Sequence, residues 1–368
     1  MLNAPRQRPL SSTAGNFLAE AAISEGVHGL VFPGLAPSCP DAAWFRKLKQ
    51  AYYQIAVANI RKLQALDEIE AALAAARIPV LAIKGVAMLD HFYPDAGARF
   101  MEDMDMMVDP SRREAFDALL IRAGYQRHRA FKHIYHKDDI TIDVHTHPLN
   151  IGRIASRDFL PSAQLSSIWT EARPLKPGFL YLRRPADTDM FILALHHLIK
   201  HSLSRLIWLL DLKQMVACQS ASFWQQLEEK ATAYQQKRII AYGLYLLRNH
   251  LHWHPPPPHP PHPPDTVGFE TGLPRLSRIE TNILDLWGRT RQTGDTGHLL
   301  WLLCLPTVRQ RAAFLIESAF PKKTILRQEQ PLSSTTSSVK ELYWFRSRQV
   351  VDRLLKNLVI LHKGFLRK

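Results

Sequence analysis

The spacing of hydrophobic residues changes along the chain and separates helical segments from strands. Between residues 41 and 77 they recur every three or four positions among Ala, Leu, Lys and Glu, which predicts a long amphipathic helix with Asp41 as its N-cap. Residues 78–85, IPVLAIKG, are a short apolar run that ends in glycine, which is typical of a buried strand. A short helix over residues 86–93 follows, and Pro94 closes it.

The next segments predict a second strand, a second helix and two further strands. The strand is MDMMV, residues 104–108. Asp109 and Pro110 then supply a cap and a first-turn proline for a helix that ends at Gly124. Two strands are expected over residues 128–136 and 139–145, joined by a tight turn near Asp138. Residues 78–147 therefore predict the order β-α-β-α-β-β, a small mixed sheet with helices.

The remaining segments complete a division of the chain into five parts. Residues 1–40 are rich in Pro, Gly and Ser and are expected to be irregular. The leading helix and the sheet occupy residues 41–150, and residues 151–250 have helical periodicity. Residues 251–270 form a Pro/His-rich linker, and helices resume within residues 271–368. The predicted fold class is α+β, with a mainly helical C-terminal domain.

The composition is that of a globular protein with a substantial core, because 46% of the residues are hydrophobic and 22% are charged. No run of about eighteen apolar residues occurs, so no transmembrane helix is expected. The N-terminus lacks the continuous apolar region of a secretory signal. Three scattered cysteines, Cys39, Cys218 and Cys304, argue against a disulfide framework or a zinc site. Together these features predict a reduced, cytoplasmic setting.

The formal net charge of +14 adds a preference for anionic partners, which include nucleotides, nucleic acid and anionic membrane surfaces. A basic surface that only keeps the protein in solution explains the same charge. The sequence contains no dense basic run or basic amphipathic stripe that decides between the two interpretations.

Three carboxylates crowd into four positions of this basic chain: Glu102, Asp103 and Asp105. Because residues two apart on a strand share a face, Asp103 and Asp105 are expected to project together. Asp143 has the same relation to Thr141 and His145 in the later strand ITIDVH. If the two strands are neighbours, Asp143 joins the two aspartates in one cluster.

Such a cluster of like charges is destabilising unless positive charge lies within it. Magnesium prefers oxygen ligands and is often shared with substrate phosphates, and two ions can bridge an attacking oxygen and a phosphate group. We therefore expect Mg²⁺, as two ions carried in with a nucleotide, rather than a lysine of the protein. The alternative is an exposed acidic strand end that is paired with surface lysines.

Lys84, Gly85 and Arg99 are the candidate nucleotide-binding residues. Lys84 and Gly85 end a strand immediately before a helix, where backbone N–H groups and a close approach at glycine suit a phosphate. A simple turn with an exposed lysine is the alternative. Arg99 stands four residues before Asp103, so it either contacts a phosphate or neutralises the acidic cluster.

These motifs together resemble a known family. The strings IPVLAIKG, YPDAGARFMEDMDMMV and ITIDVHTH, over roughly residues 45–325 with the helical segment LALHHLIKHSLSRLIWLLDL, resemble a bacterial family of uncharacterised nucleotidyltransferases. That family lies within the nucleotidyltransferase (DNA polymerase beta-like) superfamily and carries L-K-G, Y-P-x-x-x-x-R, D-x-D and D-x-H motifs.

The resemblance implies a minimal nucleotidyltransferase fold with a helical companion domain. It implies that Asp103 and Asp105 hold the metal ions of the nucleoside triphosphate, that Asp143 serves the ion that activates the acceptor, and that Gly85 approaches the phosphates. The sequence departs from the superfamily where Val86 replaces the usual serine after the glycine, and where eighteen positions separate Gly85 from Asp103.

The function expected from this resemblance is transfer of a nucleoside monophosphate, with AMP favoured, from ATP or another NTP to an acceptor, with release of pyrophosphate. The acceptor is unidentified and is a small molecule, a saccharide, a peptide or a protein; the motifs do not indicate nucleic acid. The alternative is a non-catalytic protein that binds a nucleotide or a partner on the same scaffold. In the helical half, His197, His201, Trp208 and Asp211 either line the acceptor cleft or belong to the core.

Overall fold

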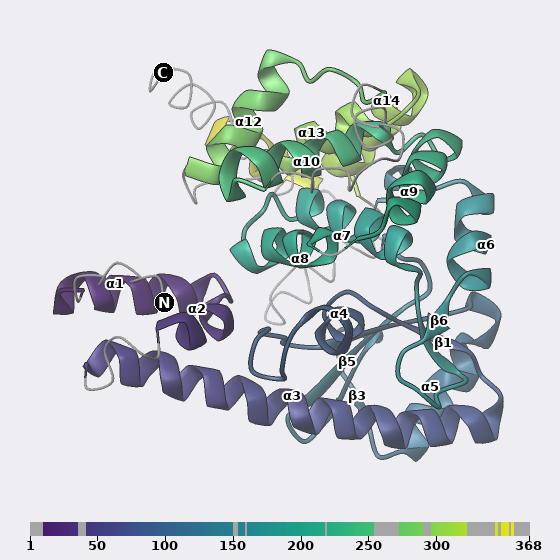
Figure 1. Cartoon of the computed structure of the whole chain (residues 1–368). Coiled ribbons are helices and arrows are strands. Elements are labelled where there is room, and N and C mark those ends of the chain that lie inside the picture. The colour runs from purple at the N-terminus through teal and green to yellow at the C-terminus, as the bar shows by residue number, and fades with distance from the viewer. Residues whose placement is uncertain are drawn as a thin grey trace.

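The computed structural model describes residues 10–35, 42–149, 154–158, 160–217, 219–253, 272–289 and 296–321, with short stretches between 343 and 356. Figure 1 shows a mixed sheet that lies beside the long helix α3, and a layer of helices above the sheet. The α+β prediction is confirmed. No helix in the described ranges is both long enough and apolar enough to cross a membrane.

The sheet has seven strands in the order β3-β4-β5-β2-β1-β7-β6. Its central strands β2 and β5 run parallel, whereas β1 and β2 run antiparallel. At one edge β7 pairs in parallel with β1, and β6 pairs with β7. The strands are β1 (Val80–Ile83), β2 (Met104–Val108), β3 (Gln126–Arg127), β4 (Ile134–Lys137), β5 (Ile140–His145), β6 (Arg173–Pro174) and β7 (Leu182–Arg184).

Helix α3 (Ala43–Ala76) begins with Ala42 at its N-cap, and Asp41, the predicted cap, lies outside the described residues. The helix ends at Arg77, whose backbone is left-handed with φ 53°. Near this end the buried carboxylate of Glu70 accepts hydrogen bonds from the backbone N–H groups of residues 180, 181 and 182 at 2.6–3.1 Å. Glu70 therefore fastens α3 to the start of β7.

The remaining helices come from both halves of the chain. The N-terminal half contributes α1 (Ser12–Ser24), α2 (His28–Leu35), α4 (Gly85–Phe92) and α5 (Arg113–Arg122), the last preceded by the 3-10 turn η1 (Pro110–Arg112). The turn η2 (Ala155–Arg157) and α6 (Ser162–Thr170) lead into the helical layer. This layer contains α7 (Asp187–Lys200), α8 (Leu206–Val216), α9 (Ala221–Ala233), α10 (Lys237–Leu251), α12 (Arg278–Arg289), α13 (Gly297–Cys304) and α14 (Val308–Ala319).

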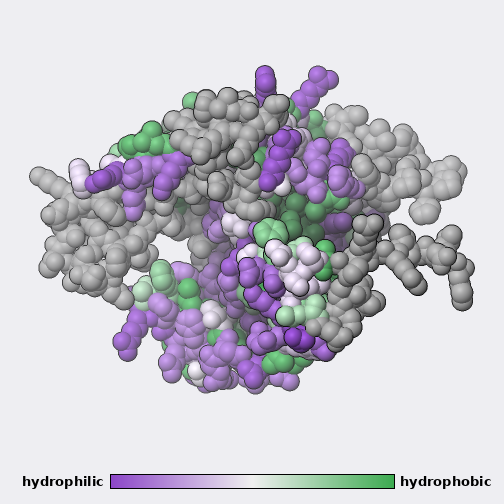
Figure 2. Space-filling view, turned by 90° about the vertical axis from the view of Figure 1, so that its left-hand side faces the viewer, coloured by the Kyte–Doolittle hydropathy of each residue, from purple (hydrophilic) through white to green (hydrophobic). Residues whose placement is uncertain are grey.

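The two faces of the central strands bury different sets of residues. Met104, Met106 and Val108 belong to the main hydrophobic core, as strand alternation predicts. Met107 lies on the other face in a small second cluster with Leu81, Ile83, Ile168 and Ala172. Asp105 shares that second face, so its carboxylate points away from the main core. On the side of the molecule seen in Figure 2, hydrophilic residues cover most of the described surface.

Several predictions need correction. Residues 1–40 are not irregular throughout, because α1 and α2 pack against α3. The strand expected at residues 128–136 is shorter and begins at Ile134, where β4 pairs with β5. The sheet also does not end at residue 150, since β6 and β7 extend it within the segment that was expected to be helical. Most of the Pro/His-rich linker lies outside the described residues.

Candidate active site

A cavity of about 350 Å³ lies between the sheet and helices α7 and α8. It contains all six residues that the sequence predicts for the site, namely Lys84, Gly85, Arg99, Asp103, Asp105 and Asp143. The opposite wall comes from the helical layer and includes His197, Lys200, His201, Arg205, Trp208 and Asp211. These residues line the cavity, while Trp208 also packs against the main hydrophobic core and Asp211 is buried, so the helical segment has features of both interpretations.

Strand register brings the two central aspartates together. Asp105 of β2 is directly opposite Asp143 of the neighbouring parallel strand β5. Asp103 also lines this cavity, but it lies in the bend that precedes β2 and not on the strand. The convergence of the three carboxylates on one cavity agrees with the sequence interpretation, whereas strand alternation does not account for Asp103.

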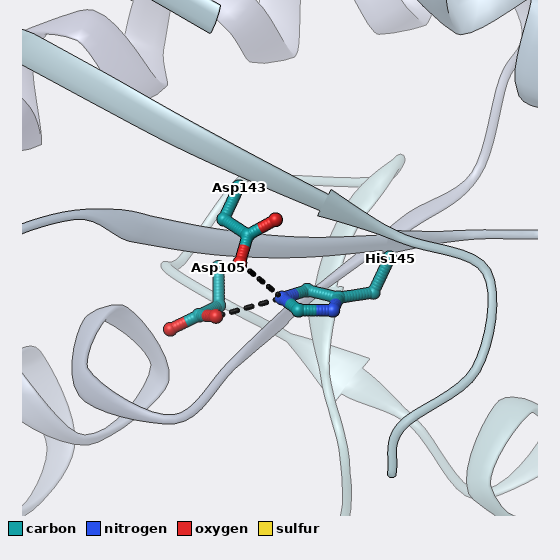
Figure 3. A group of neighbouring side chains, drawn as sticks. All are labelled: Asp105, Asp143 and His145. Carbon is teal, nitrogen blue, oxygen red and sulfur yellow. Dashed lines mark hydrogen bonds and ion pairs between the residues drawn. The ribbon is translucent and has the colours of Figure 1, made fainter. Parts of the chain in front are cut away.

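His145 completes the cluster and was not among the predicted site residues (Figure 3). Its Nε2 lies 2.7 Å from Asp105 Oδ1 and 3.2 Å from Asp143 Oδ2, and its side chain is buried. Burial opposes a charged imidazole, but the hydrogen bonds that His145 donates to both aspartates outweigh it and raise the pKa of His145. Strand alternation already placed His145 on the face of Asp143, so the sequence contained a signal for it.

Lys84 supplies a second positive charge. Its ammonium donates a hydrogen bond to Asp105 Oδ1, the same oxygen that His145 contacts. The side chain of Asp105 is only 7% exposed, so this is a largely buried ion pair. The expectation that the balancing charge would not be a lysine of the protein is wrong, because Lys84 pairs with Asp105. The alternative of an exposed lysine in a simple turn is wrong as well.

The pKa values of the three aspartates shift in different directions. Burial raises the pKa of Asp103 to about 6, and the negative charges of Asp105 and Asp143 add to that rise. For Asp105, burial acts in the same upward direction, but the Lys84 charge and the His145 hydrogen bond outweigh it and lower the pKa well below its ordinary value. Burial also opposes ionisation of Asp143, yet its contacts with His145 lower its pKa. Asp105 and Asp143 are thus ionised at neutral pH.

Arg99 is held by Asp211 rather than by the acidic cluster. Its Nε and Nη2 donate to the two carboxylate oxygens of Asp211, each at 2.7 Å, and both side chains are buried. The hydroxyl of Tyr93 also donates to Asp211, at 2.6 Å. The proposal that Arg99 neutralises the aspartates of the cluster is therefore wrong, because its partner is the buried carboxylate of Asp211.

Gly85 makes room for Arg99 at the N-terminus of α4. A Cβ atom added to Gly85 would lie 2.5 Å from Arg99 Nη1, closer than Cβ atoms approach their neighbours, so the Arg99 side chain would have to shift. Because Nε and Nη2 are engaged by Asp211, Nη1 is the guanidinium nitrogen that lies against the start of this helix. The glycine therefore places a fixed positive charge beside the helix N-terminus, an arrangement suited to a phosphate.

Three aromatic rings form the helical wall of the cavity. His197, His201 and Trp208 lie with their ring centroids 4.6–5.3 Å apart. Burial lowers the pKa of His197 well below its ordinary value, so its imidazole is neutral. Arg205, on the same wall, pairs with Glu102 at 2.8 Å across the cavity mouth.

The central cluster fits a divalent cation. Asp105, Asp143 and His145 each offer a ligand atom, and these atoms lie within 4.8 Å of one another. Asp143 Oδ1 is buried and has no hydrogen-bond partner among the described residues, since His133 Nε2 lies 3.9 Å away. A buried carboxylate oxygen without a partner is costly unless a cation or a bound group satisfies it. The carboxylate oxygens of this set suit magnesium or manganese.

Comparison with known proteins assigns the chain to a family. A family model described as uncharacterised nucleotidyltransferase matches residues 12–252. The chain belongs to this family. The match covers the sheet, the cavity and helices α1 to α10, so the two N-terminal helices are part of the shared unit, whereas the resemblance in the sequence motifs began only near residue 45. No curated protein and no solved structure matches the chain. Membership of this nucleotidyltransferase family supports nucleotidyl transfer in general.

Proposed function

We propose that this protein is a metal-dependent nucleotidyltransferase that moves a nucleoside monophosphate, AMP in the first instance, from ATP to an acceptor with release of pyrophosphate. The observation that carries the proposal is the cluster of Asp105, Asp143 and His145 at the cavity of a nucleotidyltransferase family member, with one buried carboxylate oxygen that lacks a hydrogen-bond partner among the described residues. The acceptor is a small molecule, a saccharide, a peptide or a protein.

The acidic cluster and the N-terminus of α4 have separate roles in this proposal. Asp103, Asp105 and Asp143 would hold two magnesium ions, and His145 would orient the two central carboxylates through its buried hydrogen bonds. When bound, such ions stabilise the charge that develops on a transferring phosphoryl group and on its leaving group. Arg99 Nη1 and the N-terminus of α4 would position the triphosphate, and Asp143 would face the acceptor.

The helical wall is assigned to the acceptor. His197, His201 and Trp208 face the aspartates across the cavity, so a group bound against these rings lies within reach of the triphosphate. The neutral imidazole of His197 is able to accept a hydrogen bond from an acceptor hydroxyl. Little covalent chemistry falls to the protein, and positioning supplies much of the rate.

A non-catalytic nucleotide-binding protein is the second candidate. It is disfavoured because binding alone does not require three carboxylates that repel one another in a cavity, where Asp103 is forced to a raised pKa. Binding of a triphosphate without turnover is the result that would favour it.

Transfer from a labelled nucleotide tests the proposal. ATP labelled at the α-phosphate is incubated with magnesium, the full chain and a cell extract that contains small molecules, peptides and proteins. Labelled product and pyrophosphate should both form, and both should be lost with Asp105→Asn and with chelation of magnesium. Labelled product that forms equally well with Asp105→Asn would contradict the proposed site.

A further inference from the structure

Lys84 occupies the side of Asp105 that a metal ion would need. Lys84 and His145 both donate to Oδ1 of Asp105, the oxygen that Asp105 turns toward His145 in Figure 3. A carboxylate oxygen has about two lone-pair sites, so two donors saturate it. A cation can bind this oxygen only after one of the two donors has left.

Of the two donors, Lys84 is the one free to move. His145 is 3% exposed and is also held by Asp143, whereas the Lys84 side chain is 26% exposed and lines the cavity. Its ammonium is at the end of a flexible four-carbon stem, so it can turn into the cavity without moving the backbone.

The backbone of Lys84 indicates that the lysine is there for its side chain. Its φ of 56° with ψ −132° is a conformation that favours glycine and strains other residues. Such strain is stored where the surrounding structure requires a particular side chain. Here it directs a lysine at Asp105, the aspartate that His145 also contacts.

We propose that Lys84 is the internal counterion of Asp105 in the ligand-free protein and that it gives way when a divalent cation arrives with a nucleotide. The displaced ammonium then pairs with the triphosphate. This inference rests on the proposed function and adds to it the order in which Lys84 leaves Asp105 and the cation binds. A cation alone must break a buried ion pair and finds Asp105 Oδ1 occupied, whereas the nucleotide gives Lys84 a new anionic partner. Metal and nucleotide therefore bind cooperatively.

Manganese binding to the full chain tests this order, with free Mn²⁺ followed by electron paramagnetic resonance. Without nucleotide, the parent protein should bind Mn²⁺ weakly, and Lys84→Met should bind it at least about tenfold more tightly. A non-hydrolysable ATP analogue should tighten Mn²⁺ binding to the parent protein and should do so much less in Lys84→Met.

Two further variants make the test decisive. Lys200→Met removes one positive charge from the same cavity wall and should change Mn²⁺ affinity by less than about twofold. Lys84→Gln keeps a polar side chain and replaces Lys84→Met if that variant does not fold. Equal Mn²⁺ affinity of the parent and both folded Lys84 variants, without nucleotide, would overturn the counterion role. Since this arm contains no nucleotide, its outcome is independent of whether transfer occurs.

Discussion

Asp103 has the protonation behaviour that is easiest to test at the scale of a single residue. Burial, together with the charges of Asp105 and Asp143, raises its pKa from the ordinary 3.8 to about 6. Between these two pH values the folded chain keeps a proton that the unfolded chain has lost. Stability contributed by protonated Asp103 is therefore present at low pH and is lost as the pH rises through about 6.

Asp103→Asn should abolish this loss. We expect the variant to exceed the parent in free energy of unfolding at neutral pH by up to about 3 kcal/mol, since one pKa unit corresponds to about 1.4 kcal/mol. The two proteins should converge at acidic pH. Urea unfolding in metal-free buffer across this range measures the difference, with Glu102→Gln as a control that neutralises the adjacent, exposed carboxylate. A difference that does not vary with pH would contradict the assignment.

At the scale of elements, the start of α4 depends on Gly85. In Gly85→Ala the new Cβ would meet Arg99 Nη1, and Arg99 is held by Asp211. We expect a loss of about 1–3 kcal/mol in stability, the usual cost of overpacking, and a large loss of nucleotide binding. Gly34→Ala in α2 is the matched control, because nothing lies within 4 Å of its Cβ position. Unchanged nucleotide affinity in Gly85→Ala would show that the N-terminus of α4 does not take part in nucleotide binding.

The junction of α3 with the sheet depends on Glu70. Glu70→Ala leaves three backbone N–H groups of residues 180–182 without their acceptor, at a cost of about 3 kcal/mol or more. Glu68→Ala removes an exposed partner of Lys137 two residues earlier and should cost less than about 1 kcal/mol. Urea unfolding of the two variants compares these costs. Similar values for both would mean that Glu70 does not fasten α3 to β7.

The sequence predicted those elements in which periodicity and chemistry agree. The helical spacing of hydrophobic residues over a long segment predicted α3. Alternation of residues around Asp105 and Asp143 predicted β2, β5 and the convergence of the two carboxylates. The two-residue strand β6 and the three-residue strand β7 are too short to show any period, and β7 joins the sheet by packing beside β1. Sequence spacing carries no information on such a distant pairing.

Within the site, the residues were predictable but their partners were not. Lys84, Arg99 and Asp105 all line the cavity, as expected. The pairing of Lys84 with Asp105 and of Arg99 with Asp211 depends on side-chain directions across 21 and 112 positions of the chain. Those directions follow from the left-handed backbone at Lys84 and from the placement of α8, neither of which a local pattern encodes.

At the scale of the whole molecule, the Arg99–Asp211 pair joins the sheet half to the helical layer across the cavity. Both side chains are buried, so removing one partner leaves an uncompensated buried charge at a cost of about 3–5 kcal/mol. Arg99→Met and Asp211→Leu should each destabilise by this amount, and the double variant should lose less than the sum of the two. Unfolding by urea measures all three. Additive losses would show that the two residues are not coupled.

The most direct test of the central claim is a thermal-shift series with a non-hydrolysable ATP analogue, magnesium, and both together. A ligand that binds only the folded chain raises its melting temperature. The account predicts that the combination stabilises the parent protein by more than the separate effects added, and that Asp105→Asn abolishes this gain while it remains folded. If the combination gives no additional shift, or if Asp105→Asn responds like the parent, then the acidic cluster is not a metal–nucleotide site.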